Sequence, residues 1–384
     1  MVACESSGDA HGSHLIKELQ KVFSSLEVRG LGGPRMAEAG MDSLYDMTTI
    51  SALGLGDVLR QYFKYLGIFN RAVDTIHRWK PDVVVVIDSP AFNLRLAKKI
   101  SRAVPVLYYI GPQLWAWAGG RIRVVQKHIA RMMVILPFEE ELYRKAGVPC
   151  TFVGHPLLDE LAPASDPAAL RRQIGLGPDE KAVGLMAGSR SKEVVRIFPA
   201  MLETAALLKK RLPHTRFFFR PAPNLPFSLY QSFLARHPGL EVTHPELGFR
   251  ELIASMDFAL VASGTATLET ALIGTPYFLL YKASTSTYLL GKQLIRVPYL
   301  GLVNLLAGKS VVPEFIQNDM RPEKMADLAE GFLKSPEKGT AMKNELSKIR
   351  ELLGTSGASR RTAECIAAFL QSRTSGPAEQ RQPL

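Results

Sequence analysis

An apolar run of strand length, a small polar turn and a helical stretch follow one another over residues 258–276. Phe258–Ala262 is apolar throughout, the next three residues are Ser-Gly-Thr, and the pattern from Ala266 onward is typical of a helix. A helix start gathers unpaired backbone N–H groups and the positive end of the helix dipole, which together stabilise an anion. Gly264 allows a ligand to approach the backbone closely because it has no Cβ. This stretch predicts a strand–turn–helix unit of an α/β fold.

Two interpretations of that turn are open. Glu269 lies one turn into the helix, where its carboxylate can accept hydrogen bonds from the two hydroxyls of a ribose. The turn would then be the seat of a nucleotide diphosphate. The alternative is an ordinary strand-to-helix turn capped by Ser or Thr, which is common in α/β proteins. The residues alone do not choose between them, because the signal is weaker than that of a Walker loop.

Length and charge narrow the function classes. The 384 residues are enough for two α/β domains, and the net charge of +11 favours acidic partners. Such partners are phosphate-bearing substrates, nucleic acid or an anionic membrane surface. The basic residues are dispersed and no nucleic-acid-binding motif is found, so we do not expect a nucleic acid.

Cysteine usage and apolar runs bear on the compartment. The cysteines Cys4, Cys150 and Cys365 have neither a metal-binding spacing nor a disulfide pattern, which suits a reducing cytoplasm. No apolar run approaches the roughly 18 residues that a membrane span needs. The N-terminus lacks the pattern of a signal peptide. We expect a soluble or peripheral protein.

A strand with a carboxylate at its end is predicted in the first half of the chain. Val83–Ile87 is a continuous β-branched run, as expected for a parallel strand that is covered on both faces. Asp88 follows at once, at the edge where α/β folds bind ligands. A charged group is costly there without a partner, so we favour a functional role over a helix cap or a loop aspartate.

The remaining pattern alternates between strands and helices. The glycine-containing turn at Glu5–Asp9 leads into a helix over Ala10–Phe23, and its lack of a GxGxxG pattern gives no support for a dinucleotide site. Met1–Cys4 is too short for a complete strand, so the first residues of that strand are expected to be missing. Gly30, Gly32 and Gly33 precede Pro34 and are interpreted as a turn. Other strands are predicted at Val104–Ile110, Met132–Leu136, Cys150–Val153, Ala182–Met186, Arg216–Arg220, Leu240–Thr243 and Tyr277–Tyr281.

Helical spacing extends over Asp57–Trp79. One face is predicted to pack on a core and carries Leu59, Tyr62 or Phe63, Leu66, Phe69, Val73 and Ile76. Further apolar residues lie off this face, among basic ones: Val58, Tyr65 and Ile68 with Arg60, Lys64 and Arg71. Such a helix is either buried on two sides or lies on an anionic bilayer.

The second half of the chain repeats the α/β pattern after a boundary near residues 154–167. The turn Gly188-Ser189-Arg190 follows a predicted strand, and the guanidinium fork of Arg190 suits a diphosphate. The alternative is a surface arginine near a helix start. Val303–Phe315 has no clear periodicity and is a candidate ligand-facing segment.

Taken together, the motifs resemble the lipid-A-disaccharide synthase family, glycosyltransferases of the bacterial lipid A pathway. The resemblance rests on E-S-S-G-D at Glu5–Asp9, I-D-S-P-A-F-N at Ile87–Asn93, P-Q-L-W-A-W at Pro112–Trp117, P-F-E at Pro137–Glu139, F-V-G-H-P at Phe152–Pro156, G-S-R at Gly188–Arg190, A-S-G-T-A-T-L-E at Ala262–Glu269 and N-L-L-A-G at Asn304–Gly308. The motifs are modest singly, and their number and order make the match specific.

The resemblance implies the GT-B fold: two Rossmann-like domains facing across a cleft. Residues 1–160 would form the acceptor- and membrane-facing domain, and residues 161–340 would form the UDP-sugar domain. Residues 341–371 would be helices that pack back across the domains, and residues 372–384 a disordered tail.

The resemblance also implies a reaction. UDP-2,3-diacylglucosamine and 2,3-diacylglucosamine 1-phosphate would be joined into a β-1,6 disaccharide 1-phosphate, with inversion and release of UDP. Asp88 would be the general base, and Arg190 would stabilise the leaving diphosphate together with backbone N–H groups of the two turns. The chain contains no Asp-x-Asp, so neither a metal nor a cofactor is expected. The family usually has a second aspartate where this chain has Ala91.

Three sets of contacts follow from the resemblance. The expected UDP-sugar contacts are Gly188, Ser189, Arg190, Ser263, Gly264, Thr265, Glu269, Tyr281, Asn304, Glu314 and Gln317. The expected acceptor contacts are Glu5, Ser7, Gly8, Asp9, Asn93, Trp115 and Trp117. The expected membrane contacts are Leu59, Arg60, Tyr62, Phe63, Lys64, Tyr65 and Ile68.

Two alternatives remain at this point. A UDP-N-acetylglucosamine epimerase shares the architecture but needs no lipid site, and a non-catalytic UDP-sugar-binding or membrane-scaffolding protein is the other. We expect the protein at the cytoplasmic face of the inner membrane as a peripheral enzyme. The sequence leaves a homodimer open.

Overall fold

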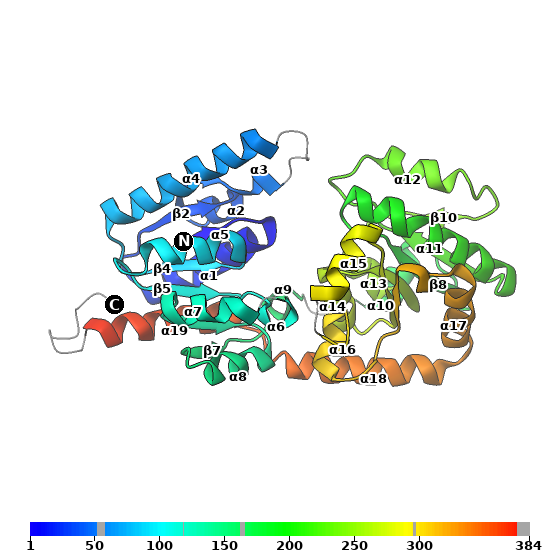
Figure 1. Ribbon diagram of the computed structural model, residues 1–384. Coiled ribbons are helices and arrows are strands. Elements are labelled where there is room, and N and C mark those ends of the chain that lie inside the picture. Colours follow the sequence, from blue (N-terminus) through cyan, green and yellow to red (C-terminus); the bar gives the residue numbers. More distant parts are fainter. Residues whose placement is uncertain (52–57, 118, 162–165, 295–296, 375–384) are drawn as a thin grey trace. The chain divides into compact units, whose positions relative to one another are not determined.

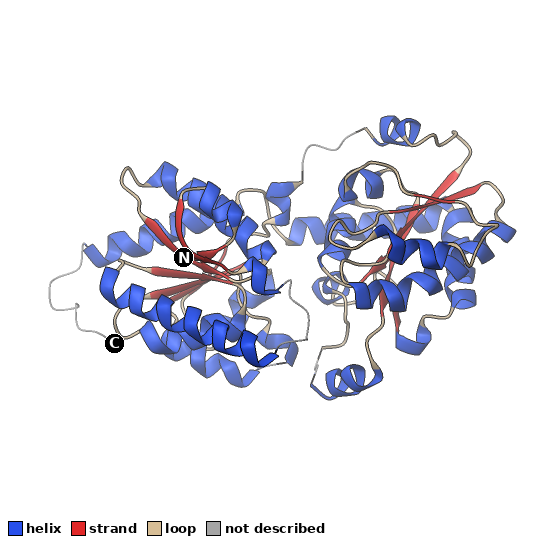
Figure 2. Ribbon diagram, turned by 90° about the horizontal axis from the view of Figure 1, so that it is seen from above, coloured by secondary structure: helices blue, strands red, loops and turns tan. Residues whose placement is uncertain are grey.

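The computed structural model describes residues 1–51, 58–117, 119–161, 166–294 and 297–374. The chain divides into two compact units. Unit 1 comprises Met1–Glu160 and Leu353–Leu384, and unit 2 comprises Leu161–Leu352. Each unit is a parallel sheet with helices on both faces (Figures 1 and 2), which confirms the predicted α/β class with two Rossmann-like domains.

Within the described residues, the sheet of unit 1 has seven strands in the order β3-β2-β1-β4-β5-β6-β7, and every strand pair is parallel. The strands are β1 (Val2–Ala3), β2 (Val28–Gly32), β3 (Met41–Asp46), β4 (Val84–Ile87), β5 (Val106–Tyr109), β6 (Arg131–Val134) and β7 (Cys150–Phe152). The helices are α1 (Ser6–Val22), α2 (Pro34–Glu38), α3 (Thr48–Ser51), α4 (Val58–Trp79), α5 (Pro90–Ile100), α6 (Leu114–Trp117), α7 (Ile122–His128), α8 (Pro137–Lys145), α9 (Leu157–Glu160) and α19 (Ala358–Thr374).

Strand β4 is apolar throughout because both of its faces are buried. Val84 and Val86 point into a core cluster on one face of the sheet, and Val85 and Ile87 point into a cluster on the other. The second cluster also contains Ala363 and Ile366 of α19, which packs along α1. The last helix of the chain therefore belongs to unit 1, beside α1 (Figure 1).

Within the described residues, the sheet of unit 2 has six strands in the order β10-β9-β8-β11-β12-β13, again all parallel. The strands are β8 (Lys181–Met186), β9 (Thr215–Phe219), β10 (Val242–Thr243), β11 (Phe258–Ala262), β12 (Tyr277–Tyr281) and β13 (Glu314–Ile316). The helices are α10 (Pro167–Gln173), α11 (Ser191–Arg211), α12 (Phe227–Leu234), α13 (Phe249–Ala254), α14 (Thr265–Ile273), α15 (Thr285–Leu294), α16 (Leu302–Ala307), α17 (Pro322–Lys334) and α18 (Pro336–Leu352).

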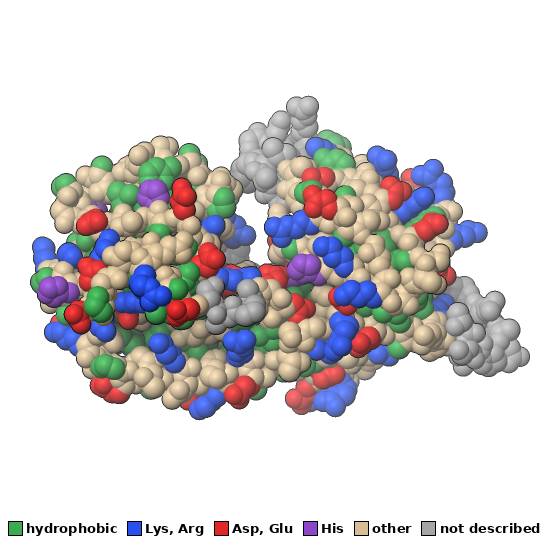
Figure 3. All heavy atoms as spheres, turned by 180° about the vertical axis from the view of Figure 1, so that it is seen from behind, with side chains coloured by type: hydrophobic (Ala, Val, Ile, Leu, Met, Phe, Trp, Pro, Cys, Tyr) green, Lys and Arg blue, Asp and Glu red, His purple; other side chains and the backbone are tan. Residues whose placement is uncertain are grey.

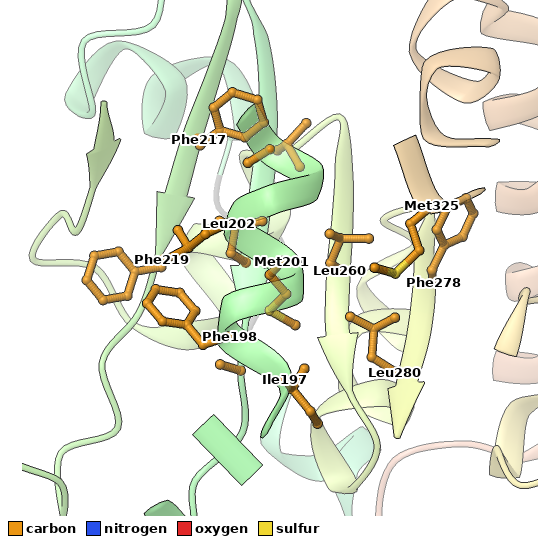
Figure 4. Packing of buried hydrophobic residues seen from close by; sticks show 14 of the residues in the cluster. Ile197, Phe198, Met201, Leu202, Phe217, Phe219, Leu260, Phe278, Leu280 and Met325 are labelled. Atoms are coloured by element: carbon orange, nitrogen blue, oxygen red, sulfur yellow. The ribbon is translucent and has the colours of Figure 1, made fainter. Parts of the chain in front are cut away.

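One face of the second sheet is covered by α11 and α17. Figure 4 shows Phe198, Met201 and Leu202 of α11 directed toward the strands that carry Phe217, Phe219 and Leu260. The spacing of three to four residues along α11 places these side chains on one stripe of the helix, which is the stripe that is buried. This packing holds β8 and β11 in place, and the site of unit 2 lies at their ends.

The turn that was predicted at the glycine-rich stretch near residue 30 is wrong, because Gly30 and Gly32 lie in strand β2. A Cβ on Gly30 would lie 1.7 Å from the carbonyl oxygen of Met1, so the close approach of the β1 segment requires glycine there. Gly33 is the residue before α2, and a Cβ on it would meet the Asp9 carboxylate at 2.7 Å. These glycines therefore serve close packing.

Helix α4 runs from Val58 to Trp79, and its buried stripe differs in part from the prediction. Ile68 is 7% exposed within the core, and the Tyr65 ring meets Phe92 edge-on at 5.2 Å. The expected membrane contacts at Ile68 and Tyr65 are therefore wrong for this structure, because both side chains pack inward. Phe63 is 64% exposed and Lys64 is exposed. The side chains of Leu59, Arg60 and Tyr62 lie outside the described residues.

The distribution of charged side chains on the surface agrees with the predicted dispersal of the basic residues. On the face drawn in Figure 3, Lys and Arg side chains are interspersed with Asp and Glu. Among the helices of the described residues, none is both long and apolar enough to cross a membrane.

Candidate active site

In each unit the strand order reverses at one point, and the predicted site residues gather there. In unit 1 the reversal lies between β1 and β4, whose carboxyl ends lead to Glu5 and Asp88. In unit 2 it lies between β8 and β11, which lead to the Gly188 turn and the Gly264 turn. Ligands of open α/β sheets bind at such reversal points, outside the carboxyl ends of the strands.

Asp88 sits in a strained turn that three contacts hold. Asp88 and Ser89 have φ angles of 49° and 46°, which non-glycine residues rarely adopt. The buried side chain of Asn93 donates from Nδ2 to the carbonyl oxygens of Ile87 at 3.0 Å and Asp88 at 2.6 Å. The Tyr108 hydroxyl donates to the same Asp88 carbonyl at 2.6 Å. The turn fixes the direction of the Asp88 carboxylate at the sheet edge.

The environment of Asp88 makes it a better base than an exposed aspartate. Burial raises the pKa of its carboxyl, the backbone N–H of Ser89 lowers it, and the Glu5 carboxylate raises it. Burial also raises the pKa of the neighbouring Cys4 thiol to about 12, so Cys4 stays neutral. A strand-end carboxylate with a raised pKa can accept a proton from a substrate hydroxyl.

Asp9, an expected acceptor contact, is instead a helix cap. It is buried, its Oδ1 accepts from the backbone N–H groups of Gly33 and Met36 at 2.8 and 3.0 Å, and its Oδ2 accepts from that of Arg35 at 3.1 Å. These groups belong to the start of α2 and have no partner within that helix. The acceptor role of Asp9 is therefore wrong, because its oxygens are committed to the protein.

Replacing Asp9 with alanine should lower the free energy of unfolding by about 2 kcal/mol, because buried N–H donors at the start of α2 lose their acceptor. Hydrogen exchange over α2 and a denaturant titration would measure this loss. Asp42→Ala removes an exposed carboxylate from β3 and is the matched control. A variant with wild-type stability and a weakened acceptor KM would show instead that Asp9 binds the acceptor.

The other expected acceptor residues divide between the sheet edge and the interior. Glu5 and Ser7 are exposed at the start of α1. Gly8 is buried against Ala3, and Asn93 donates to the Asp88 turn, so the acceptor contacts of these two residues stay a prediction. Trp115 is half-buried and donates its indole N–H to Glu139 at 3.1 Å. The side chain of Trp117 lies outside the described residues.

In unit 2 a cavity of about 340 Å³ lies at the ends of β8 and β11. Its lining includes most of the predicted phosphate-turn residues, namely Gly188, Ser189, Arg190, Ser263, Gly264 and Thr265. Gly188 has φ of 98° and Gly264 has φ of 154°, backbone conformations that favour glycine. The structure thus brings together two turns that are about 75 residues apart in the sequence.

The two turns differ in what they offer an anion. Glu193 Oε2 accepts from the backbone N–H groups of Ser189 and Arg190, both at 3.2 Å, so these amides are already bonded. This corrects the expectation that both turns present available N–H groups. The Gly264 turn is different, because the amides of Gly264 and Thr265 have no hydrogen-bond acceptor within the described part of the chain.

Arg190 lies at the mouth of the cavity. Its side chain is 80% exposed, and its Nη1 donates to Glu193 Oε1 at 3.1 Å. A single exposed ion pair holds such a side chain weakly, so the guanidinium can turn to an anion in the cavity. The role of Glu193 was not predicted from the sequence, although an acidic residue three positions after a helix cap is a known capping signal.

Arg220 is a second basic residue of the cavity that sequence reasoning missed. It follows β9, lines the same cavity and donates from Nε to the Leu247 carbonyl oxygen at 3.2 Å. This contact leaves the terminal nitrogens of the guanidinium for a ligand. Its position became visible only when the fold placed the end of β9 beside that of β8.

The other five expected UDP-sugar residues are not part of the lining of this cavity. Glu269 forms an ion pair with Arg250 and lines a second cavity of about 1090 Å³. Phe249 lines both this cavity and the cavity of about 340 Å³. Asn304 is buried and bonded to the Val311 and Val312 backbone, and Glu314 accepts from the amides of Leu300 and Gly301.

Gln317 exchanges two hydrogen bonds with the Ala283 backbone. The polar groups of Asn304, Glu314 and Gln317 thus hold neighbouring loops, and their direct donor contacts stay a prediction. Tyr281, the last residue of β12, is half-buried.

Within the described residues, no group of three or more acidic, histidine or cysteine side chains lies close enough together to hold a metal ion.

Known proteins resemble this chain both in sequence and in fold. Residues 1–369 match the family described as lipid-A-disaccharide synthetase. The chain belongs to this family. A lipid-A-disaccharide synthase from Syntrophus aciditrophicus is 40% identical over 366 residues, which are 94% of this chain and 95% of the relative. Lipid-A-disaccharide synthase 1 from Legionella pneumophila strain Lens is 38% identical over 379 residues, 97% of each chain. Members of this family are glycosyltransferases of lipid A biosynthesis, so the chain is an enzyme of that class.

Solved structures share the fold at low identity. A UDP-GlcNAc 2-epimerase from Neisseria meningitidis bound to UDP-GlcNAc has a TM-score of 0.61 at 15% identity, covering 95% of this chain and 98% of its own. MurG from Acinetobacter baumannii has a TM-score of 0.58 at 14% identity, covering 96% and 98%. These likenesses establish the GT-B fold.

Proposed function

We propose that the enzyme transfers the diacylglucosaminyl group of UDP-2,3-diacylglucosamine to the 6-hydroxyl of 2,3-diacylglucosamine 1-phosphate. The products are the β-1,6 disaccharide 1-phosphate and UDP. The observation that carries this proposal is the family match, which spans both units and includes the Asp88 turn and the Arg190 turn in one chain. The names of the relatives support the same disaccharide product.

The base in this reaction is Asp88. Its carboxylate accepts the proton of the acceptor 6-hydroxyl while that oxygen bonds to the anomeric carbon of the donor. The bond from this carbon to the UDP oxygen breaks on the opposite side, which inverts the configuration. The half-buried position of Asp88 in the turn after β4, and the upward shift of its pKa, support this role, because proton transfer needs a well-placed base.

The leaving UDP carries the electron pair of the broken bond. The guanidinium groups of Arg190 and Arg220 and the amides of the Gly264 turn stabilise its negative charge. In this proposal the protein itself neutralises the diphosphate, without a metal ion. The nucleoside extends toward the larger cavity, where Glu269 accepts from the ribose hydroxyls in place of Arg250.

Both substrates carry acyl chains, so the enzyme works at a membrane surface. The exposed Phe63 and Lys64 near the start of α4 combine an apolar ring with a positive charge, as interfacial helices do. In this proposal the protein is peripheral at the cytoplasmic face of the inner membrane.

The membrane contact predicts binding to anionic vesicles at low salt. Phe63→Ser should lower the partition coefficient about tenfold, because the ring no longer enters the apolar layer. Sedimentation with phosphatidylglycerol vesicles measures this. Leu289→Ser removes an apolar side chain that is 56% exposed in unit 2 and serves as the control. Equal binding of the wild type and Phe63→Ser would refute the contact.

Product analysis tests the reaction itself. The enzyme is incubated with both substrates in mixed micelles containing EDTA, and the product is examined by mass spectrometry and NMR. We expect a disaccharide 1-phosphate with a β-1,6 linkage, formed at the same rate with and without EDTA. Conversion of the donor sugar without acceptor would favour an epimerase. Loss of activity in EDTA would refute stabilisation of the leaving group by the protein alone.

A further inference from the structure

The Pro137-Phe138-Glu139 motif has no part in the proposed chemistry, yet it contains a buried acid. Glu139 is only 1% exposed, in the first turn of α8, directly after β6. Its Oε1 accepts from the Trp115 indole N–H at 3.1 Å, and its Oε2 accepts from the Leu136 amide at 3.3 Å. Within the described residues its hydrogen bonds come only from neutral N–H groups, an expensive arrangement for a carboxylate.

Helix α8 holds the 110–117 loop, whose last four residues form the short helix α6, at three points. Besides the Glu139 bond, the Phe138 ring meets the Trp115 ring edge-on at 5.1 Å. The Tyr143 hydroxyl donates to the Pro112 carbonyl oxygen at 3.1 Å. A Cβ on Gly111 would lie 3.0 Å from Met132, so the loop also packs closely on β6. The loop position therefore depends on α8.

This loop borders the Asp88 turn. It follows β5, which pairs with β4 up to the register Ile87 with Tyr109. Tyr108 of β5 donates to the Asp88 carbonyl, so the strand that leads into the loop also fixes the base. A shift of the loop would therefore change the surroundings of Asp88 on the side away from β1, where β5 lies.

We propose that Glu139 is a positioning residue that fixes the 110–117 loop through Trp115 and thereby shapes the acceptor side of the site around Asp88. This inference rests on the proposed function for its kinetic consequence. Its structural part, the hold of Glu139 on Trp115, stands independently of the reaction.

The hydrogen bond between Glu139 and Trp115 should depend on pH, because the carboxyl of Glu139 changes its protonation state. Burial raises the pKa of its carboxyl to about 7, while hydrogen bonds from Trp115 and the backbone of Leu136 and Ile135 lower it. The ionised form accepts from all these donors. Protonation below pH 7 turns one acceptor into a donor, so the hold on Trp115 weakens.

Two titratable groups that face Glu139, Tyr143 and Cys150, have pKa values far from this range. Burial raises the pKa of Tyr143 on the same helix far above neutral, and that of Cys150 on β7 to about 12. The adjacent Glu140 accepts from the Phe152 amide instead. A signal from Trp115 with a midpoint near pH 7 would therefore report Glu139.

Glu139→Gln tests the proposal with little change in shape. The amide offers one oxygen and one NH₂ to two N–H donors, so it cannot accept from both Trp115 and Leu136. We expect the acceptor KM to rise about tenfold, with kcat and the donor KM within twofold of the wild type. In a background of Trp79→Phe and Trp117→Phe, which leaves Trp115 as the one tryptophan of the chain, the fluorescence should titrate near pH 7 with Glu139 in place and should lose this titration in Glu139→Gln. Glu141→Gln changes an exposed residue of α8 and is the control.

Two outcomes would overturn the inference. One is an unchanged acceptor KM together with a fluorescence titration that persists in Glu139→Gln. The other is a uniform loss of kcat and stability, which indicates a role in folding alone. If the wild type transfers no sugar, the proposed function fails, and the fluorescence titration still decides whether Glu139 holds Trp115.

Discussion

Replacing Asp88 with asparagine should lower kcat about a thousandfold, because the amide cannot accept the proton of the attacking hydroxyl. The donor KM should hardly change, since the cavity assigned to the diphosphate lies in unit 2. Asparagine keeps the size of the side chain, and the carbonyl that Asn93 and Tyr108 hold belongs to the backbone. Steady-state kinetics in mixed micelles measure both constants.

The pH profile sharpens this test. Because burial raises the pKa of Asp88, kcat/KM of the wild type should fall as the pH drops through that pKa and the carboxyl becomes protonated. The variant should lack this acidic limb. Asp82→Asn, at the opposite end of the same strand segment, is an exposed control that should leave kcat and the profile unchanged. A variant at position 88 that retains a tenth of the wild-type kcat would exclude Asp88 as the base.

Replacing Arg190 with glutamine should lower kcat by about 10²- to 10³-fold, the usual cost of removing one group that stabilises developing charge. The effect should fall mainly on kcat, because negative charge on the leaving diphosphate grows in the transition state. Arg220 and the Gly264 turn remain and should preserve most of the donor affinity. Single-turnover kinetics separate the chemical step from product release.

A charge-matched control comes from the same helix. Lys210 is exposed near the other end of α11, and Lys210→Gln removes one positive charge there. We expect wild-type kinetics from that variant, since only the charge at the cavity matters. If Arg190→Gln raised the donor KM and left kcat intact, Arg190 would bind the ground state alone and the proposed role would be wrong.

Strands that are covered on both faces could be predicted from the sequence because their apolar runs are unbroken. Phe258–Ala262 and Tyr277–Tyr281 begin and end as predicted, and the Val83–Ile87 run lacks only its first residue in the structure. Strand β2 was missed because Gly30 and Gly32 dilute its apolar pattern. Gly30 is needed because the Met1 backbone lies close to it, and no local pattern reveals this contact.

The candidate site was predictable where position along a strand decides it. Asp88 and the Gly188 and Gly264 turns follow their strands directly, so the parallel sheets bring them to carboxyl edges. The ligand contacts of Asp9 and Asn304 follow only from the resemblance. Most of their hydrogen-bond partners are backbone groups that lie seven or more residues away, and only the folded chain shows these bonds.

Glu139 was seen in the sequence only as part of a motif. Nothing local indicates that it is buried, since the surrounding residues of α8 are largely charged. Its environment comes from Trp115 on another segment, so its role follows from tertiary packing.

UDP release from UDP-2,3-diacylglucosamine, measured with and without 2,3-diacylglucosamine 1-phosphate, tests the transferase mechanism directly. We expect release that depends on the acceptor and collapses in both Asp88→Asn and Arg190→Gln. UDP release at the same rate without acceptor, or undiminished release in these two variants, would contradict the transferase mechanism assigned to this site.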